Sequence, residues 1–195
     1  MAVSIVINSE SILIAAERNN LVYFYQAVDL PPETVKDGYI IDRKFVAGKI
    51  DAIFKSARLP RSQVYATIAG MSYIYRVLAL PKMKLAMLPE AIERATQKEI
   101  HLPLSDLYLD WQIISQSEKE ITVYVQGVPR RLIDALFDTL KAAGIEPAAV
   151  GLKSLALARA VNQFNALIVD FEPDWFDIII VSKNITNFYN CIGII

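Results

Sequence analysis

The sequence contains few residues of the types that catalysis or metal binding requires. Its 195 residues include one histidine, His101, and one cysteine, Cys191. No serine, cysteine or carboxylate stands where the sequence would place it beside His101, so we interpret His101 as a helix-end residue. Cys191 lies in an apolar stretch, where a free cysteine behaves as a small hydrophobic side chain. We therefore expect no catalytic residues, no metal site and no internal disulfide.

An alternating aromatic segment offers a binding surface rather than a reactive group. Tyr73, Tyr75 and Leu80 fall within a predicted strand over residues 73–80. Aromatic side chains are enriched where proteins bind one another, so these residues can line a groove for a partner peptide. They can equally pack against a predicted helix around Ile92. The pattern alone leaves both interpretations open.

Charge and hydropathy argue against two classes of partner. The chain has 20 Lys plus Arg and 21 Asp plus Glu, so no basic surplus exists to neutralise a nucleic-acid backbone. Mean hydropathy is high at +0.33, yet no uncharged apolar run reaches the roughly 18 residues that a membrane-spanning helix needs. Charged residues also interrupt the N-terminal stretch early, unlike a secretion signal. We expect a cytoplasmic protein without a membrane span or a nucleic-acid partner.

The elements that must position these residues alternate between strands and helices. Short strands at 3–7, 11–16 and 21–28, separated by turn-forming residues, predict a β-meander. A helix follows Asp42, which can cap it, and two more strands are expected at 64–69 and 73–80. The sequence therefore begins as a meander followed by a helix.

The remaining pattern continues this alternation. It predicts a helix from about residue 85 to 100, a hairpin across the polar turn 116–120, and a helix that begins near Pro129 and ends at Gly144. A short strand at 147–151 and a helix from 152 to about 164 follow. Strand-like segments at 166–170, 176–181 and 186–195 then form a second meander. The meander opening thus recurs, which is a feature of duplicated folds.

Several short motifs follow one another in a characteristic order and spacing. They are Leu30-Pro31-Pro32, Asp37-Gly38-Tyr39-Ile40-Ile41-Asp42, Leu80-Pro81, Glu90-Ala91-Ile92, Glu99-Ile100, His101-Leu102-Pro103, Asp110-Trp111-Gln112-Ile113 and Ala142-Ala143-Gly144-Ile145-Glu146-Pro147. In this order they resemble the PilM family, actin-like cytoplasmic proteins of type IV pilus machines that are related to the cell-division protein FtsA.

The resemblance implies an α/β fold of the actin-like, or ribonuclease-H-like, kind. Residues 1–70 plus 117–165 would form the first actin-like subdomain, and residues 71–116 would form a small inserted α/β subdomain. Residues 166–195 would be the incomplete start of a second actin-like half.

The same resemblance implies a first phosphate loop, and this sequence departs from it. The loop's Asp, Gly and Lys are replaced by Val6, Asn8 and Leu13, and only Ser9 and Ser11 remain as small polar residues. The other interpretation of these two serines is a hairpin turn.

The second loop departs as well. Asp170 is retained, but Glu172 would place a carboxylate against phosphate oxygens, and Pro173 removes a backbone N–H donor. Ser9, Ser11 and Asp170 are thus the expected remnant of a degenerate nucleotide site. The other interpretation of Asp170 is a solvated strand end.

The functional expectation is a non-catalytic scaffold that uses no cofactor. By resemblance it would bind the cytoplasmic N-terminal segment of a bitopic inner-membrane protein like PilN, with Tyr73, Tyr75 and Leu80 at the groove, and so be peripheral to the inner membrane. The alternative is an ATP-binding actin-like switch or ATPase that uses ATP and Mg²⁺. Uncovered strands also predict self-association through residues 166–195.

Overall fold

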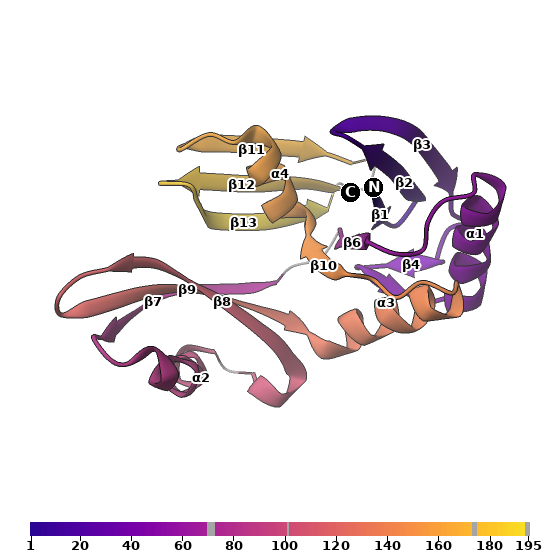
Figure 1. Ribbon diagram of the computed structural model, residues 1–195. Helices are drawn as coiled ribbons and strands as arrows, with labels where there is room; N and C mark the ends of the chain where they lie inside the picture. Colours follow the sequence, from indigo (N-terminus) through magenta and orange to yellow (C-terminus); the bar gives the residue numbers. More distant parts are fainter. Residues whose placement is uncertain (70–72, 101, 173–174, 194–195) are drawn as a thin grey trace. The chain divides into compact units, whose positions relative to one another are not determined.

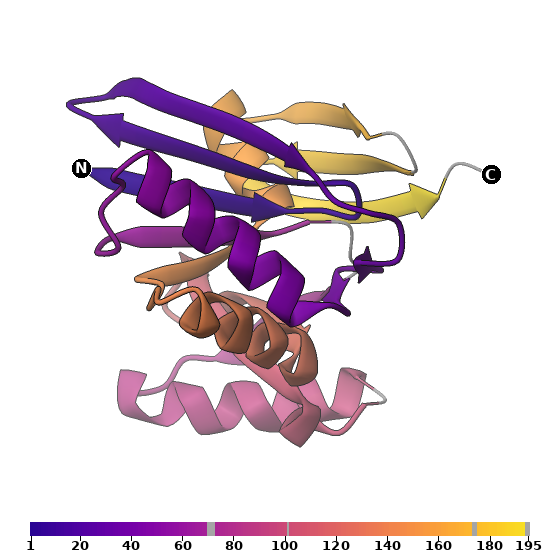
Figure 2. The same cartoon turned by 90° about the vertical axis from the view of Figure 1, so that its right-hand side faces the viewer.

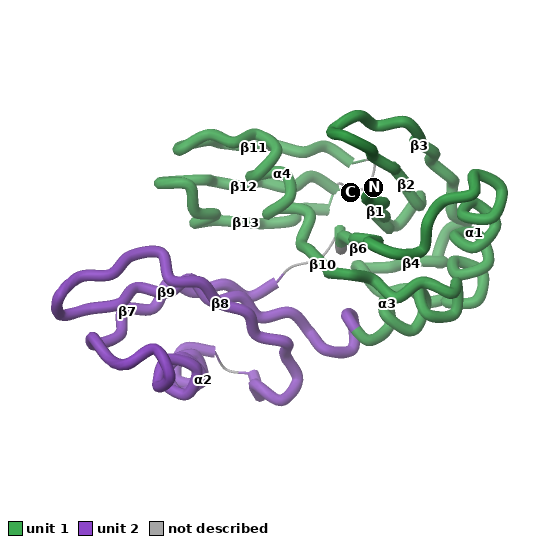
Figure 3. Tube along the Cα trace, viewed as in Figure 1, with its two compact units in different colours: residues 1–72, 134–195 green, residues 73–133 purple. Residues whose placement is uncertain are grey.

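The computed structural model describes the whole chain except residues 70–72, 101, 173–174 and 194–195 (Figure 1). His101 and Pro173, which the sequence singled out, therefore lie outside the described residues. The chain divides into two compact units, residues 1–72 with 134–195 and residues 73–133 (Figure 3). Each unit contains both strands and helices, in agreement with the predicted α/β class.

The first unit contains a five-stranded mixed sheet in the order β10-β6-β1-β2-β3. Its strands are β1 (Ala2–Ile7), β2 (Ser11–Arg18), β3 (Leu21–Asp29), β6 (Val64–Ile68) and β10 (Ala149–Leu152). The first three pair antiparallel, whereas β6 is parallel to both β1 and β10. Alternate residues of β1 and β2 are buried, as a sheet with one covered face requires. The predicted opening meander is confirmed.

Helix α1 (Arg43–Ser56) runs along this sheet (Figure 2). It buries apolar residues at helical spacing, including Val46, Ile50 and Phe54. The carboxylate of Asp42 accepts a hydrogen bond from the Phe45 N–H at 3.0 Å and so satisfies a donor that has no partner within the helix. The predicted cap is confirmed.

A small hairpin precedes α1 where the sequence predicts only an interruption. Strands β4 (Val35–Lys36) and β5 (Tyr39–Ile40) pair across Asp37 and Gly38. Both of these turn residues have positive φ, 49° and 77°, as a tight two-residue hairpin turn requires. The pairing was missed because each strand is too short to show a period of two.

The first unit also contains a three-stranded antiparallel sheet, β11-β12-β13. The strands are β11 (Ala166–Phe171), β12 (Trp175–Ser182) and β13 (Ile185–Gly193), and helix α4 (Lys153–Val161) contacts all three (Figure 1). The β12–β13 turn, Lys183-Asn184, has the same pair of φ angles, 53° and 62°, as the β2–β3 turn, Asn19-Asn20. The second meander therefore repeats the turn geometry of the first.

The second unit is a three-stranded antiparallel sheet in the order β7-β9-β8 with a helix on one face. Its elements are β7 (Ile74–Pro81), η1 (Leu85–Met87), α2 (Leu88–Glu99), η2 (Leu104–Asp106), β8 (Leu107–Gln116) and β9 (Glu120–Pro129). Leu88 and Ile92 of α2 pack against alternate residues of β7 and β9 in a buried core. Helix α3 (Arg130–Ala142) follows β9 directly.

The predicted boundaries of the insertion need one correction. The sequence ended the inserted subdomain at residue 116, but β9 pairs with β7 on one side and with β8 on the other, so the insertion extends to residue 133. A central strand cannot belong to a different unit from both of its neighbours, because its backbone groups are satisfied by them. Residues 166–195, predicted as the start of a separate half, group with the first unit.

Candidate functional site

A buried ionic cluster lies where α4 meets the sheet β11-β12-β13. Lys153, the first residue of α4, has a side chain that is only 14% exposed. Its ammonium lies 2.5 Å from Asp170 Oδ2 and 3.9 Å from Asp177 Oδ2, and it also contacts Glu172 Oε1. One cation therefore lies near three carboxylates, which come from β11, from the residue that follows it and from β12.

The carboxylates determine the protonation state of this lysine. Burial lowers the pKa of the Lys153 ammonium, but hydrogen bonds to Asp170 and Glu172 and their negative charges outweigh it, so the pKa lies above its ordinary value. Lys153 is therefore charged at neutral pH and acts as a fixed cation.

Asp177 is the most buried member of the cluster. It is fully buried on β12, between Asp170 of β11 and Cys191 of β13 in the strand register. Its Oδ1 accepts a hydrogen bond from the Tyr189 hydroxyl at 3.1 Å. Burial raises the pKa of the Asp177 carboxyl above its usual range, while hydrogen bonds from Cys191 and Tyr189 and the charge of Lys153 oppose the shift.

The turn between β1 and β2 joins this cluster through Asn8. The Asn8 Oδ1 accepts from the Glu10 N–H at 3.0 Å, the Ser11 N–H at 2.6 Å and the Ser11 hydroxyl at 3.0 Å. Its Nδ2 donates to Glu172 Oε2 at 3.5 Å. The Ser9 hydroxyl is buried and has no hydrogen-bond partner among the described residues. The structure thus brings the two predicted loops together, with the Ser11 hydroxyl engaged in its own turn.

These residues do not fit a magnesium-bound nucleotide. Asp170, which would face the metal, is occupied by the Lys153 ammonium, and Glu172 faces the first turn with a carboxylate that would repel phosphate. Backbone N–H groups can approach a phosphate closely only where the turn residue has no side chain, as glycine does. Here the side chain of Asn8 occupies the turn.

Sequence reasoning missed Lys153, although the sequence carries a signal for it. A lysine in the first turn of a helix is opposed by the positive end of the helix dipole, so it needs compensating negative charge nearby. Lys153 is the only charged residue in the largely apolar segment 147–157. That isolation indicates a buried ion pair, but nothing in the sequence says with which carboxylates.

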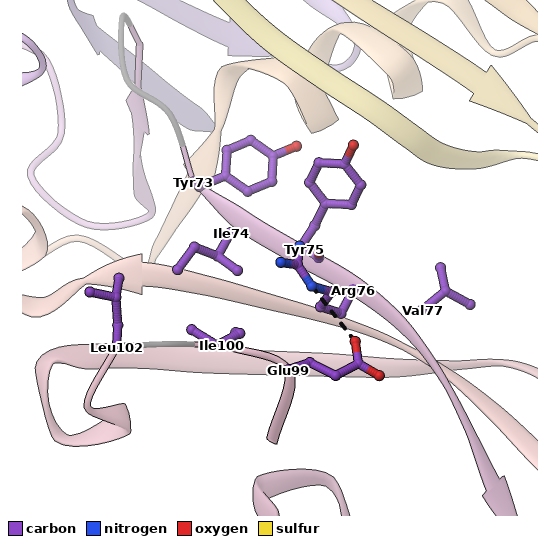
Figure 4. Close-up of a pocket in the computed structure, with 8 residues that line it drawn as sticks. All are labelled: Tyr73, Ile74, Tyr75, Arg76, Val77, Glu99, Ile100 and Leu102. Carbon is purple, nitrogen blue, oxygen red and sulfur yellow. Dashed lines mark hydrogen bonds and ion pairs between the residues drawn. The ribbon is translucent and has the colours of Figure 1, made fainter. Parts of the chain in front are cut away.

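A second candidate site is a pocket in the unit of residues 73–133. It has a volume of about 460 Å³, within the usual range of ligand pockets. Its lining comes from strand β7, the end of α2 and the segment after it (Figure 4): Tyr73, Ile74, Tyr75, Arg76, Val77, Glu99, Ile100 and Leu102.

The pocket surrounds the free edge of β7. Ile74 and Arg76 lie on the side of Ile100 and Glu99, whereas Tyr73 and Tyr75 point away on the other side of the strand (Figure 4). The Arg76 guanidinium lies 3.7 Å from the Glu99 carboxylate. Among the described strands, β7 pairs with β9 alone, so its other edge can offer backbone groups to a further strand.

Of the three predicted binding residues, the two tyrosines line the pocket and Leu80 does not. Leu80 is 7% exposed and belongs to the core with Leu88 and Ile92. Residues 73 and 80 differ by an odd number along the strand, so their side chains point to opposite faces of the sheet. For Leu80 the structure shows the predicted alternative, packing against the helix around Ile92, and a partner groove at these residues stays a prediction. The tyrosines pack on one another, with ring centroids 6.2 Å apart.

Two features are absent from the described part of the chain. No group of three or more His, Cys, Asp or Glu side chains in the described part of the chain is arranged to hold a metal ion. Among the same residues, no helix has both the length and the apolar character needed to cross a membrane.

Solved structures share the fold of this chain. A chain of the PilM-PilN type IV pilus biogenesis complex matches with a TM-score of 0.81 at 16% identity, covering 98% of this chain and 61% of that one. The cytoplasmic domain of EpsL, an inner membrane component of the type II secretion system of Vibrio cholerae, matches with a TM-score of 0.63 at 15% identity, covering 98% of this chain and 70% of that one. The ethanolamine utilization protein EutJ from Carboxydothermus hydrogenoformans matches with a TM-score of 0.59 at 13% identity, covering 98% of this chain and 51% of that one.

These matches establish the actin-like fold predicted from the motifs. The chain spans about three-fifths of the matched chain in the PilM-PilN complex. A comparison with curated protein sequences gave no match. The sequence itself matches the family described as type IV pilus assembly protein PilM over residues 5–189. The chain therefore belongs to the PilM family of type IV pilus assembly proteins.

Proposed function

We propose that this chain is a non-catalytic scaffold of a type IV pilus or related secretion assembly. It acts at the cytoplasmic face of the inner membrane and binds the cytoplasmic N-terminal segment of a bitopic, PilN-like protein. Membership of the PilM family supports the assembly role. A PilN partner is supported by the fold match to a chain of the PilM-PilN complex.

The observation that carries the proposal is the pocket at the free edge of β7. An extended peptide can add a strand to such an edge, where main-chain hydrogen bonds supply affinity and side-chain pockets supply specificity. Val77 is 47% exposed beside the tyrosines. Apolar side chains of a tail segment would gain burial there, while Arg76 and Glu99 would fix its polar groups.

The test is a titration with a synthetic peptide that corresponds to the cytoplasmic N-terminal segment of the organism's PilN-like membrane protein. We expect saturable binding, and we expect Val77→Lys to weaken it by about tenfold or more, equivalent to about 1.4 kcal/mol. Ile113→Lys is the matched control, since Ile113 is a β-branched residue, 38% exposed, on the opposite edge strand β8. Equal loss in both variants, or no binding by the intact chain, would contradict the proposal.

The rival proposal is an ATP-binding switch or ATPase of the same machine. Calorimetry with ATP and Mg²⁺ separates the two. We expect no heat of binding, because Lys153 and Glu172 occupy the phosphate side of the site. A dissociation constant in the micromolar range would favour the switch.

We also propose that copies of the chain self-associate through residues 166–195. One face of the sheet β11-β12-β13 carries exposed apolar side chains: Leu167 at 68%, Val169 at 43%, Phe171 at 75%, Ile180 at 41% and Phe188 at 39% exposed. The edge of β11 away from β12 has no partner among the described strands. A second copy supplies both a matching apolar face and a matching edge.

A further inference from the structure

Basic residues gather in one segment of this chain. Residues 43–61 contain six basic side chains and one acidic side chain, so the segment has a formal charge of +5, whereas the whole chain has −1. The segment consists of helix α1 and most of the link from α1 to β6. A chain that is almost neutral overall therefore has a strongly basic region on one element.

Most of these charges lie on the side of α1 that faces away from the sheet, which Figure 2 shows in front. This outer face is formed by five exposed residues, Lys44, Gly48, Lys49, Ala52 and Lys55. Because an α-helix repeats every 3.6 residues, Lys44 and Lys55 lie on one flank of the face, about 17 Å apart, and Lys49 lies on the other flank. Arg58 follows the helix and is also exposed.

Three of the exposed cations in this segment are not held in salt bridges. Lys44 and Arg58 have no carboxylate oxygen within 4.0 Å among the described residues, and the Lys49 ammonium lies 5.2 Å from the centre of the Phe45 ring. The other two exposed cations each pair with an aspartate. An anionic partner can therefore meet three positive charges without breaking an ion pair.

The surface between the lysines is flat and lacks anchors. A side chain added at Gly48 would meet no atom within 4 Å. Within residues 43–61, all of which the structure describes, no large apolar side chain is exposed, whereas protein partners are usually held by a few aromatic or other large side chains. Lysine is a compact point charge on a flexible stem, suited to diffuse attraction rather than to bidentate recognition of one group. The face therefore fits a broad anionic surface.

We propose that the outer face of α1 docks on the anionic headgroups of a lipid bilayer. Each basic residue near such a surface strengthens binding about fivefold, so the three unpaired cations together supply about a hundredfold. The attraction decays over about 10 Å at 0.1 M salt, which makes the contact reversible and sensitive to salt. This contact with lipid needs no protein partner and is separate from the binding of a membrane-protein tail.

Co-sedimentation with vesicles tests the proposal. The unmodified chain should bind vesicles of phosphatidylcholine mixed with phosphatidylglycerol in about 50 mM NaCl, and about 0.5 M NaCl should release it. It should not bind vesicles of phosphatidylcholine alone. Failure to bind the anionic vesicles at low salt, or binding that persists at high salt, would overturn the proposal.

A triple variant locates the binding face. Lys44→Gln, Lys49→Gln and Arg58→Gln together remove the unpaired cations, and glutamine has nearly the helix propensity of lysine. The partition of this variant onto anionic vesicles should fall by at least about tenfold.

The matched control removes three exposed lysines from the other unit, with Lys82→Gln, Lys84→Gln and Lys98→Gln. It has the same net charge as the first triple variant, and its binding should stay within about fivefold of the unmodified chain. Equal losses in the two triple variants would show that net charge drives the binding and that α1 does not.

Other polyanions are the competing occupants of this face. Titrations with a poly-glutamate peptide and with duplex DNA, at the same low salt, compare them with the vesicles. If either polyanion binds more tightly than the vesicles and loses affinity in the α1 triple variant, the face serves a protein or a nucleic acid and the lipid proposal is wrong. No tail peptide enters these measurements, so their result is independent of the proposed function.

Discussion

At the scale of single residues, Asp177 occupies an environment that opposes its charge. It is fully buried, with Lys153 3.9 Å away and Tyr189 and Cys191 as hydrogen-bonding neighbours. Burial and the nearby Asp177 also raise the pKa of the Cys191 thiol to about 12. Cys191 is therefore a protonated thiol at neutral pH, in agreement with its interpretation as an inert, strand-packed cysteine.

The raised pKa of Asp177 predicts a specific pH dependence of stability. The unfolded carboxyl titrates near 3.8, whereas the folded one holds its proton to higher pH. Between the pKa of the unfolded carboxyl and that of the folded one, the folded state binds more protons than the unfolded state. The free energy of unfolding therefore decreases as pH rises through this range, and this loss of stability is complete above the folded pKa. Asp177→Asn lacks this loss, and its oxygen can still accept from Tyr189. Its stability relative to the unmodified chain should therefore rise from pH 4 toward pH 7.

Urea unfolding at several pH values measures this difference. Asp138→Asn is the control, since Asp138 forms an exposed salt bridge with Arg43 and should change stability by less than about 1 kcal/mol. A relative stability of Asp177→Asn that stays flat or falls with pH would show that the charged carboxylate is well accommodated.

At the scale of elements, β11 combines two features that favour pairing with another chain. It is an edge strand, and Leu167, Val169 and Phe171 on one face are exposed. Burying even ~100 Å² of apolar surface per strand in a dimer would stabilise the association by roughly 2.5 kcal/mol, at about 25 cal/mol per Å². A twofold contact gains this amount from each copy.

We expect the intact chain to form dimers in sedimentation experiments and Leu167→Lys to shift it toward monomer. A lysine at that position places a charge on the apolar face and protects the edge. Leu21→Lys is a matched control, because Leu21 is 72% exposed on the edge strand β3 of the other sheet. A monomeric intact chain at the same concentration, or equal effects of the two lysines, would refute self-association through this sheet.

At the scale of the whole molecule, each of the two units has its own buried core. Ile92 is 1% exposed in the core of residues 73–133, and Ile50 is fully buried on α1 in the other unit. Each is an isoleucine on a helix packed inside its own unit, so truncation creates the same kind of cavity in each.

We predict that the two units open separately. Ile92→Ala should cost about 2–5 kcal/mol and increase amide hydrogen exchange mainly in β7, β8, β9 and α2. Ile50→Ala should instead increase exchange in β1, β2 and α1. Hydrogen exchange followed by mass spectrometry distinguishes these patterns, and a uniform increase across both units in either variant would show that the chain opens as one cooperative body.

The sequence by itself determined the local structure of this chain. Alternation of apolar residues specified the strands of both meanders, and Asp42 and Gly144 marked a helix start and a helix end. These features depend on residues within one turn or a few positions, so sterics and local hydrogen bonds encode them. The order of short motifs was enough to identify the family.

Tertiary structure alone decided the partners of these elements. The sequence could not assign β9 to the inserted unit, because that assignment depends on strand pairing between distant segments. The period of two puts Tyr73 and Leu80 on opposite faces of their strand, but only the packing of α2 decided which face is the core. The Lys153 cluster has the same origin, since Asn8 meets Glu172 across a separation of 164 residues. Such contacts form only when the packing of whole elements brings buried charges together, and a buried charge must then find its counterion within the fold.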